Sequence, residues 1–188
     1  RFYLKFYFPP LPGGSADITT GNPSQSQYCE GQNIQIPFNI SGTFDPSNVF
    51  TAQLSNSSGD FSSPVNIGTL SGNSSGTFNA TIPLSTLNGT GYRVRVVSDN
   101  PSVIGTASSN TIEINSIPSV SYTGSLPAQC ETSSVMDLLT AGTVSPSGGT
   151  FTGNGVSGTN FDASIAGTTG SPHTITYTVV NGACSANA

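Results

Sequence analysis

Charged residues are scarce in this chain. Of its 188 residues only four are Lys or Arg and nine are Asp or Glu, which amounts to 7% charged residues and a net charge of −5. Typical soluble domains contain about 25% charged residues. Four cations cannot neutralise a run of phosphates, and nucleic-acid binding depends largely on that neutralisation. We therefore expect no nucleic-acid partner.

Long apolar runs are also lacking. No stretch approaches the roughly 20 apolar residues that a membrane-spanning helix needs, so we expect no membrane span. Gly (22 residues) and Pro (13 residues) are frequent instead. Gly, Ser, Thr and Asn take the place that Lys, Glu and Ala would have in a helical protein. This composition is typical of an all-β protein with many turns.

Short alternating apolar runs predict strands along the whole chain. In the first part we expect strands at 33–40, 49–55, 65–70, 76–82, 92–98 and 111–114, with 17–20 as an additional first strand. Ile117-Pro118 resembles a joint between domains, because Pro ends the ladder of the preceding strand. After it we expect strands at 119–123, 135–139, 149–153, 160–163 and 173–180.

These elements predict an all-β fold with two tandem Ig-like or PKD-like β-sandwich domains. We assign residues 1–15 to an apolar strand and a Pro/Gly hinge, 16–117 to the first sandwich and 118–188 to the second. The second sandwich is expected to lack its closing strand, because the chain stops shortly after Cys184. No helix longer than a turn or so is expected.

Only three cysteines are present. Cys130 follows the first expected strand of the second sandwich, and Cys184 lies just beyond the last one. A bond between them would close a loop of 54 residues (184 − 130), which contributes roughly 4 kcal/mol in the chain-entropy model. We therefore expect a Cys130–Cys184 disulfide, and a buried thiol at Cys29.

Groups suited to catalysis are few. The chain has one histidine, His173, and no Gly-x-Ser-x-Gly nucleophile elbow. Its cysteines and histidine lack the paired spacing of a zinc site. We expect no enzymatic activity, no catalytic residue, no cofactor and no metal. Calcium held by Asp45, Asp60 and Asp99 is an alternative, because oxygen ligands from several loops suffice for that ion.

Two cations lie on one expected strand. Arg93 and Arg95 alternate with apolar residues in the strand 92–98, so they share its polar face. We expect this face to be solvated. The alternative is that the two arginines bind an anion or a glycan.

The first eight residues, RFYLKFYF, contain five aromatic side chains. Phe2, Leu4, Phe6 and Phe8 fall on one face of a strand. Burying these four side chains would contribute roughly 6 to 12 kcal/mol. The following PPLPGG decouples the strand from the first sandwich. We interpret the segment as a donor strand that enters a neighbouring chain. Folding back onto its own chain, or a remnant of targeting or cloning sequence, are the alternatives.

Several phrases of the chain carry a family resemblance. They are Tyr28-Cys29, IQIPF at 34–38, NVFTAQLS at 48–55, IGT at 67–69, ATIP at 80–83 and GYRVRVV at 91–97. On these phrases, residues 17–115 resemble a module of large secreted surface proteins of the Bacteroidetes. The second sandwich resembles the Ig/PKD-like modules of the same exported proteins, including gliding-motility adhesins. Its matching residues are Cys130, GGTF at 148–151, GNGV at 153–156, IAG at 165–167 and HTITY at 173–177.

The resemblance implies export by the type IX route and a location outside the cell or at its surface. We expect a non-catalytic structural or adhesive protein, a filament subunit assembled by exchange of its N-terminal strand. Its partners would be copies of itself in a head-to-tail homopolymer, or neighbouring modules of a larger surface protein, with a glycan as a further candidate. The alternative function is an accessory module of a secreted hydrolase, acting as glycan binder or spacer.

Overall fold

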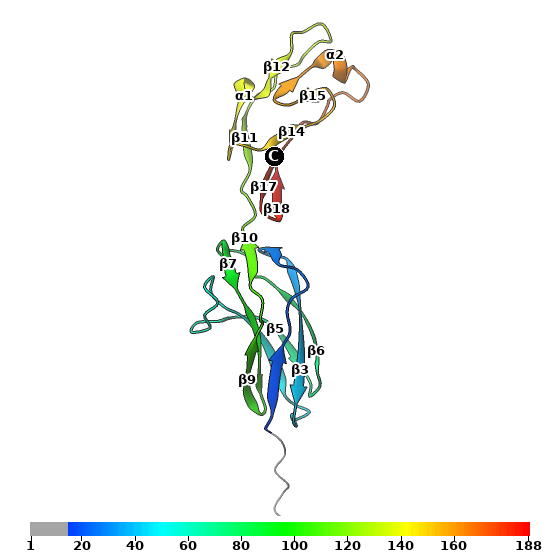
Figure 1. Cartoon of the computed structure of the whole chain (residues 1–188). Coiled ribbons are helices and arrows are strands. Elements are labelled where there is room, and N and C mark those ends of the chain that lie inside the picture. The colour runs from blue at the N-terminus through cyan, green and yellow to red at the C-terminus, as the bar shows by residue number, and fades with distance from the viewer. Residues whose placement is uncertain (1–14) are drawn as a thin grey trace, which may run out of the picture. The chain divides into compact units, whose positions relative to one another are not determined.

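The chain forms an all-β structure in a computed structural model that describes residues 15–188. Its two helices have only four residues each. The described chain divides into two compact units (Figure 1), unit 1 up to Ile114 and unit 2 from Asn115 to Ala188. This division lies near the expected joint at Ile117-Pro118.

The described part of unit 1 contains strands and no helix. They are β1 (Asp17–Thr20), β2 (Gln27–Cys29), β3 (Asn33–Ser41), β4 (Val49–Leu54), β5 (Val65–Ser71), β6 (Gly76–Thr81), β7 (Gly89–Tyr92), β8 (Val94–Asp99), β9 (Ser102–Ala107) and β10 (Ile112–Asn115). Seven form a sheet in the order β5-β4-β8-β9-β1-β3-β6, and three form a sheet in the order β2-β10-β7. A parallel pairing of Thr19 with Thr106 joins the two halves of the large sheet.

The core of unit 1 lies between these two halves. Burial alternates along β3, so Ile34, Ile36 and Phe38 all point inward. The Phe38 ring lies 4.8 Å from the ring of Phe50 on β4 and 5.3 Å from that of Phe78 on β6. The half with β3 and β6 therefore packs face to face on the half with β4, as the layers of a sandwich do.

Unit 2 has shorter strands and narrower sheets. Its elements are β11 (Ser121–Gly124), β12 (Met136–Asp137), α1 (Leu138–Ala141), β13 (Gly142–Ser145), β14 (Thr150–Thr152), β15 (Val156–Ser157), β16 (Asn160–Phe161), α2 (Ala163–Ala166), β17 (Thr176–Asn181) and β18 (Cys184–Asn187). The sheets are β11-β13, β12-β16-β15 and β14-β17-β18. Their core is a cluster of four buried residues, whereas the cluster in unit 1 has eighteen.

Two expected strands of unit 2 end after two residues because an aspartate starts a helical turn. The Asp137 side chain accepts a hydrogen bond from the Leu139 N–H, and the Asp162 side chain accepts one from the Ser164 N–H. A side-chain oxygen that accepts from the second residue of a helix is a standard N-cap. The expected strands 135–139 and 160–163 are therefore short strands that lead into α1 and α2.

Other differences from the expectation lie at turns and edges. The expected strand 92–98 is divided at Arg93 into β7 and β8. No strand was expected at β2, β9, β13, β15 or β18, which are short or rich in Gly and Ser. Residues Cys184–Asn187 form β18 as an edge strand on β17, with Val179 paired to Ala186. Unit 2 thus has a last strand that begins at Cys184.

Candidate functional site: an apolar cavity in unit 2

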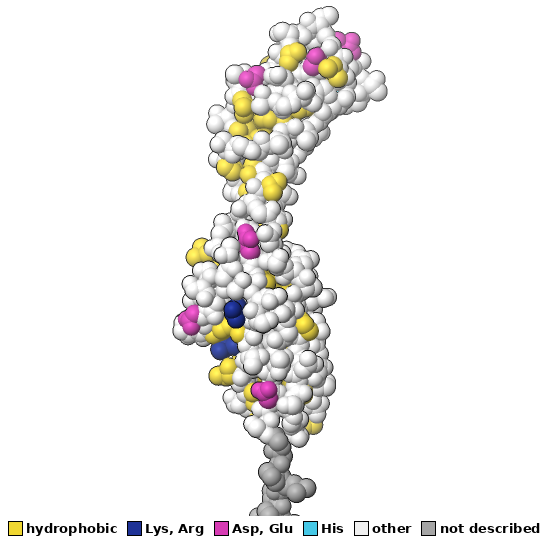
Figure 2. Space-filling view, viewed as in Figure 1, with side chains coloured by type: hydrophobic (Ala, Val, Ile, Leu, Met, Phe, Trp, Pro, Cys, Tyr) yellow, Lys and Arg dark blue, Asp and Glu magenta, His cyan; other side chains and the backbone are white. Residues whose placement is uncertain are grey.

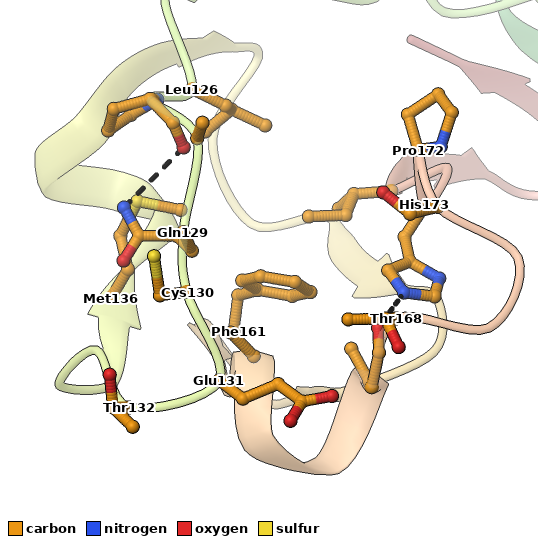
Figure 3. Close-up of a pocket in the computed structure, with 17 residues that line it drawn as sticks. Leu126, Gln129, Cys130, Glu131, Thr132, Met136, Phe161, Thr168, Pro172 and His173 are labelled. Carbon is orange, nitrogen blue, oxygen red and sulfur yellow. Dashed lines mark hydrogen bonds between the residues drawn. The ribbon is translucent and has the colours of Figure 1, made fainter.

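Unit 2 contains a cavity of about 630 Å³, which we call the Cys130 cavity (Figure 3). Three segments of the chain build its wall: the loop between β11 and β12, the strand β16 with the following α2, and the loop between α2 and β17. Most of its lining side chains are apolar, among them Leu126, Met136, Phe161, Ala163, Ala166 and Ile175. Phe161, Ala163 and Ala166 also belong to the buried core of the unit.

Phe161 lies in the middle of this cavity because of the short strand that carries it. In β16 it pairs with Met136 of β12 and with Val156 of β15. The chain then turns at the Asp162 cap, and α2 presents Ala163 and Ala166 to the same side. Small residues on α2 leave space beside the Phe161 ring, so the cavity is wide enough for further apolar side chains.

Cys130 lines the cavity as an exposed free thiol. Its backbone N–H donates to the Ser133 Oγ at 3.0 Å, and the Ser133 N–H donates to the Cys130 carbonyl at 2.8 Å. This turn holds the thiol at the cavity wall. The expected Cys130–Cys184 disulfide is therefore corrected: Cys29 and Cys184 are the disulfide-bonded cysteines, and Cys29 is not the thiol that was expected.

The reason for this correction lies in where the strands carry the cysteines. Cys130 lies in the loop before β12, beside Met136 and the open cavity. Cys184 begins β18, where it is 2% exposed and its Sγ lies 3.3 Å from the Asn115 carbonyl oxygen. Each of these two cysteines follows an expected strand in the sequence, but the fold carries their sulfur atoms to different places.

His173 lines the opposite side of the cavity from Cys130, with Phe161 between them (Figure 3). His173 was expected to start a strand, but it lies in the loop before β17. Its Nε2 lies 2.7 Å from the Gly167 carbonyl oxygen, so that nitrogen donates its proton there. Within residues 15–188, Cys130 and His173 share no hydrogen bond. The arrangement is that of two polar groups at the rim of an apolar cavity.

Hydrogen bonds fix the α2 side of the cavity. The Asn154 Nδ2 donates to the Ala166 carbonyl at 2.7 Å, and the Gly167 N–H donates to the Ala163 carbonyl at 3.0 Å. The Asp162 carboxylate accepts from the Ser164 hydroxyl at 2.6 Å and from the Ser164 N–H at 2.9 Å. These two bonds, the hydroxyl first, lower the pKa of Asp162 below its ordinary value of 3.8.

A second, smaller cavity of about 100 Å³ shares Leu126 and Ile175 with the Cys130 cavity. Tyr122, Phe151 and Tyr177 also line it. The buried Tyr122 hydroxyl has no hydrogen-bond partner in the part of the chain that the structure describes. Two neighbouring cavities in a unit with a small core give it apolar wall area that additional side chains can cover.

The other expected sites have different outcomes. Asp45, Asp60 and Asp99 do not come together, since residues 15–188 contain no group of three metal-ligating side chains. Asp45 and Asp60 instead accept hydrogen bonds from Ser47 and Ser62 in their own loops, and Asp99 accepts one from the N–H of Val49 at the start of β4. The donor-strand residues Phe2, Leu4, Phe6 and Phe8 lie outside the described residues.

No helix among residues 15–188 is long and apolar enough to cross a membrane. The signal that could have found the Cys130 cavity in the sequence is weak, because its wall comes from three separate segments with no common spacing. No family model, no curated protein and no solved structure matches this chain.

Proposed function

We propose that this chain is a non-catalytic extracellular protein with a structural or adhesive role, and that it polymerises by inserting its N-terminal strand into unit 2 of another copy. The observation that carries the proposal is the Cys130 cavity, an apolar space of about 630 Å³ in a unit with a small core. The alternating side chains of Phe2, Leu4, Phe6 and Phe8 are of the kind that such a space accommodates.

The energetic argument concerns both partners. Transfer of four large apolar side chains from water into an apolar site contributes roughly 6 to 12 kcal/mol. The walls of the Cys130 cavity, including Phe161 and Ile175, would gain dispersion contacts from the same side chains. Insertion stabilises unit 2 and covers the apolar strand in one step.

The backbone of unit 2 also suits strand addition. Its sheets have two or three strands each, and β11, for example, pairs with β13 alone. The outer edge of a strand presents N–H and C=O groups that an incoming strand can pair with. Main-chain pairing would supply affinity, and the apolar cavity would supply the choice of side chains.

Insertion of residues 1–8 of one copy into unit 2 of another copy is a heterologous contact. The donor surface, residues 1–8, and the acceptor surface in unit 2 are different, so each copy can give one strand and receive another. Contacts of this type continue into an open chain unless their rotation closes a ring. This geometry favours a filament.

We further propose that the two units are Ig-like or PKD-like sandwiches of a Bacteroidetes surface protein exported by the type IX route. The two-layer packing of unit 1 and the sequence phrases described above support this proposal. The disulfide-bonded Cys29 and Cys184 are compatible with an extracellular location, where disulfides persist.

The proposal is tested with a chain that lacks residues 1–8 and with a synthetic RFYLKFYF peptide. The full chain should form oligomers by light scattering, and the shortened chain should be monomeric. Cys130 serves as a reporter inside the chain, because an inserted strand covers its thiol. Adding the peptide to the shortened chain should slow labelling of Cys130 by a maleimide at least tenfold.

A peptide with Phe6→Asp is the matched control, since a carboxylate on the apolar face opposes burial. It should leave the labelling rate of Cys130 within twofold of the peptide-free value. If deletion of residues 1–8 leaves the size of the oligomer unchanged, the proposal of strand exchange is wrong. Equal protection of Cys130 by both peptides would contradict it as well.

A further inference from the structure

Unit 1 contains a polar cavity at the level where three strands pass from one sheet to the other. Five connections in the described part of unit 1 pass between the two sheets, and three of them border the cavity: β1 to β2, β7 to β8 and β9 to β10. The first crossover is residues 21–26, the second is Arg93 alone, and the third is residues 108–111. They surround a space of about 630 Å³, which we call the Arg93 cavity.

Arg93 is the one cation of this cavity, and it lacks a carboxylate partner within residues 15–188. It is half-buried, and one guanidinium nitrogen, Nη1, donates to the Ser108 carbonyl at 3.2 Å. Arg95 is engaged differently: its Nε donates to the Gln53 Oε1 at 2.8 Å, and its guanidinium lies 4.5 Å from the centre of the Phe61 ring. Of the two arginines, Arg93 thus has free donors facing a cavity.

The charge distribution on unit 1 agrees with this difference. Figure 2 shows dark-blue Arg side chains on the visible face of unit 1, where most of the surrounding surface is neither charged nor apolar. The chain as a whole has a net charge of −5. A ligand with several negative charges would be repelled, whereas a single carboxylate needs only one guanidinium.

Polar groups surround the guanidinium. Ser24, Gln25, Ser26, Ser109, Asn110 and Thr111 line the Arg93 cavity. Ser24, Ser26 and Thr111 are exposed, and their hydroxyls make no hydrogen bond to other described residues, so they are available to a ligand in the cavity. Hydroxyl and amide groups of this kind suit the hydroxyls of a sugar.

The wall of the Arg93 cavity is held in place before any ligand arrives. The Asn22 Nδ2 donates to the Ser109 Oγ at 2.9 Å, and the Asn110 N–H donates to the Asn22 Oδ1 at 2.9 Å. The Gln25 N–H donates to the hydroxyl of the buried Tyr28 at 3.1 Å. A wall fixed in this way loses little conformational entropy on binding.

We infer that the Arg93 cavity binds a saccharide that carries a carboxylate. The planar guanidinium fork matches a carboxylate in two parallel hydrogen bonds, better than an ammonium group would. The surrounding hydroxyls and amides take the ring hydroxyls, and the volume lies in the usual range for small-ligand sites. The inference concerns unit 1 alone and does not depend on the polymerisation proposed above.

The test is a titration of the full chain followed by ¹H–¹⁵N NMR. The probes are glucuronic acid and N-acetylneuraminic acid, with glucose, acetate and inorganic phosphate as comparisons. At least one acidic sugar should shift the Arg93 Nε–H signal and the backbone amide signals of Asn110 and Thr111. Glucose and acetate should bind at least tenfold more weakly, because each offers only half of the contacts.

Variants locate the binding. Arg93→Gln should lower the affinity for the acidic sugar about ten- to hundredfold, which is the range for the loss of a hydrogen bond to a charged group. Arg93→Lys should lower this affinity by less, and Arg95→Gln should leave it within threefold of the value for the unsubstituted chain. Thr111→Val, which keeps the charge, should cost a few-fold. Thermal unfolding of each variant shows that it folds.

Three results would overturn the inference. One is the absence of any shift with either acidic sugar. Another is binding of acetate or phosphate as tight as that of the acidic sugar, which leaves a plain anion site. The last is equal weakening by Arg93→Gln and Arg95→Gln, which places the effect in the general charge of the strand.

Discussion

The Gly149 backbone N–H donates a hydrogen bond to the Tyr177 hydroxyl at 2.7 Å, which ties the residue before β14 to the first part of β17. The same hydroxyl donates to the Pro146 carbonyl at 2.9 Å. Tyr177 is 2% exposed, and its ring lies 4.7 Å from that of Phe151. One side chain therefore packs against the small core of unit 2 and satisfies two backbone groups of the preceding turn.

Tyr177→Phe should lower the free energy of unfolding by about 1 to 3 kcal/mol, because the Gly149 N–H and the Pro146 carbonyl both lose their partner. Tyr122→Phe is the matched control, since the buried Tyr122 hydroxyl has no partner among the described residues. It should leave stability unchanged or raise it. Urea unfolding followed by fluorescence measures both variants. Equal losses for the two tyrosines would contradict this account.

The aromatic cluster of unit 1 gives a second prediction. The Phe50 ring is fully buried and lies between the rings of Phe38 and Phe44, at 4.8 and 5.3 Å. Phe50→Ala should cost about 3 to 5 kcal/mol, the usual range for a large cavity in a core. Phe61→Ala, which removes a half-buried ring below Arg95, should cost about 1 kcal/mol. Denaturant midpoints of the two variants should differ accordingly, and similar midpoints would show that the core is not where we place it.

Most of unit 1 could be predicted from its sequence. Period-two alternation in segments such as β3 and β4 reports burial on one face directly, and both strands lie where the pattern predicts them. The sequence did not predict β9, because Ser and Gly in SVIGTA conceal the alternation of apolar residues. The pairing of β9 with β8 follows instead from the tight turn at Asn100-Pro101. A strand defined by its neighbour leaves little trace in its own residues.

Unit 2 was harder to predict, because its short strands have room for only one or two periods. Asp137 and Asp162 each end such a strand by capping a helical turn, a local hydrogen bond that competes with the sheet. The wall of the Cys130 cavity comes from three separate segments of the chain, so no spacing along the sequence reveals it. Arg93 was visible as a cation on a strand, but its cavity depends on three crossovers that only the fold brings together.

The cap of α2 makes a prediction about pH. The pKa of Asp162 lies below 3.8 because the Ser164 hydroxyl and N–H donate to its carboxylate. A carboxylate with a lowered folded-state pKa contributes stability above the pKa of the unfolded chain, and this contribution disappears as the pH falls through the folded-state value. We expect the cap to be intact at neutral pH and to weaken only below about pH 4.

Ser164→Ala isolates the main cause of this shift. Without the hydroxyl, the pKa of Asp162 should rise toward its ordinary value, which a carboxyl ¹³C NMR titration measures. Ser62→Ala is the parallel case in unit 1, where the Ser62 hydroxyl is the largest cause of the lowered pKa of Asp60. Each substitution should move only its own aspartate. Unchanged titration midpoints would mean that these hydroxyls do not donate to the carboxylates in solution.

The state of the three cysteines can be determined by mass spectrometry. Iodoacetamide should add one group to the unreduced chain, on the peptide with Cys130, and three groups after reduction. The reason is that Cys130 is an exposed free thiol, whereas Cys29 and Cys184 are disulfide-bonded. Cys130→Ser should abolish labelling of the unreduced chain and leave two sites after reduction. An adduct on the peptide with Cys29 instead would restore the Cys130–Cys184 pairing that the sequence favoured.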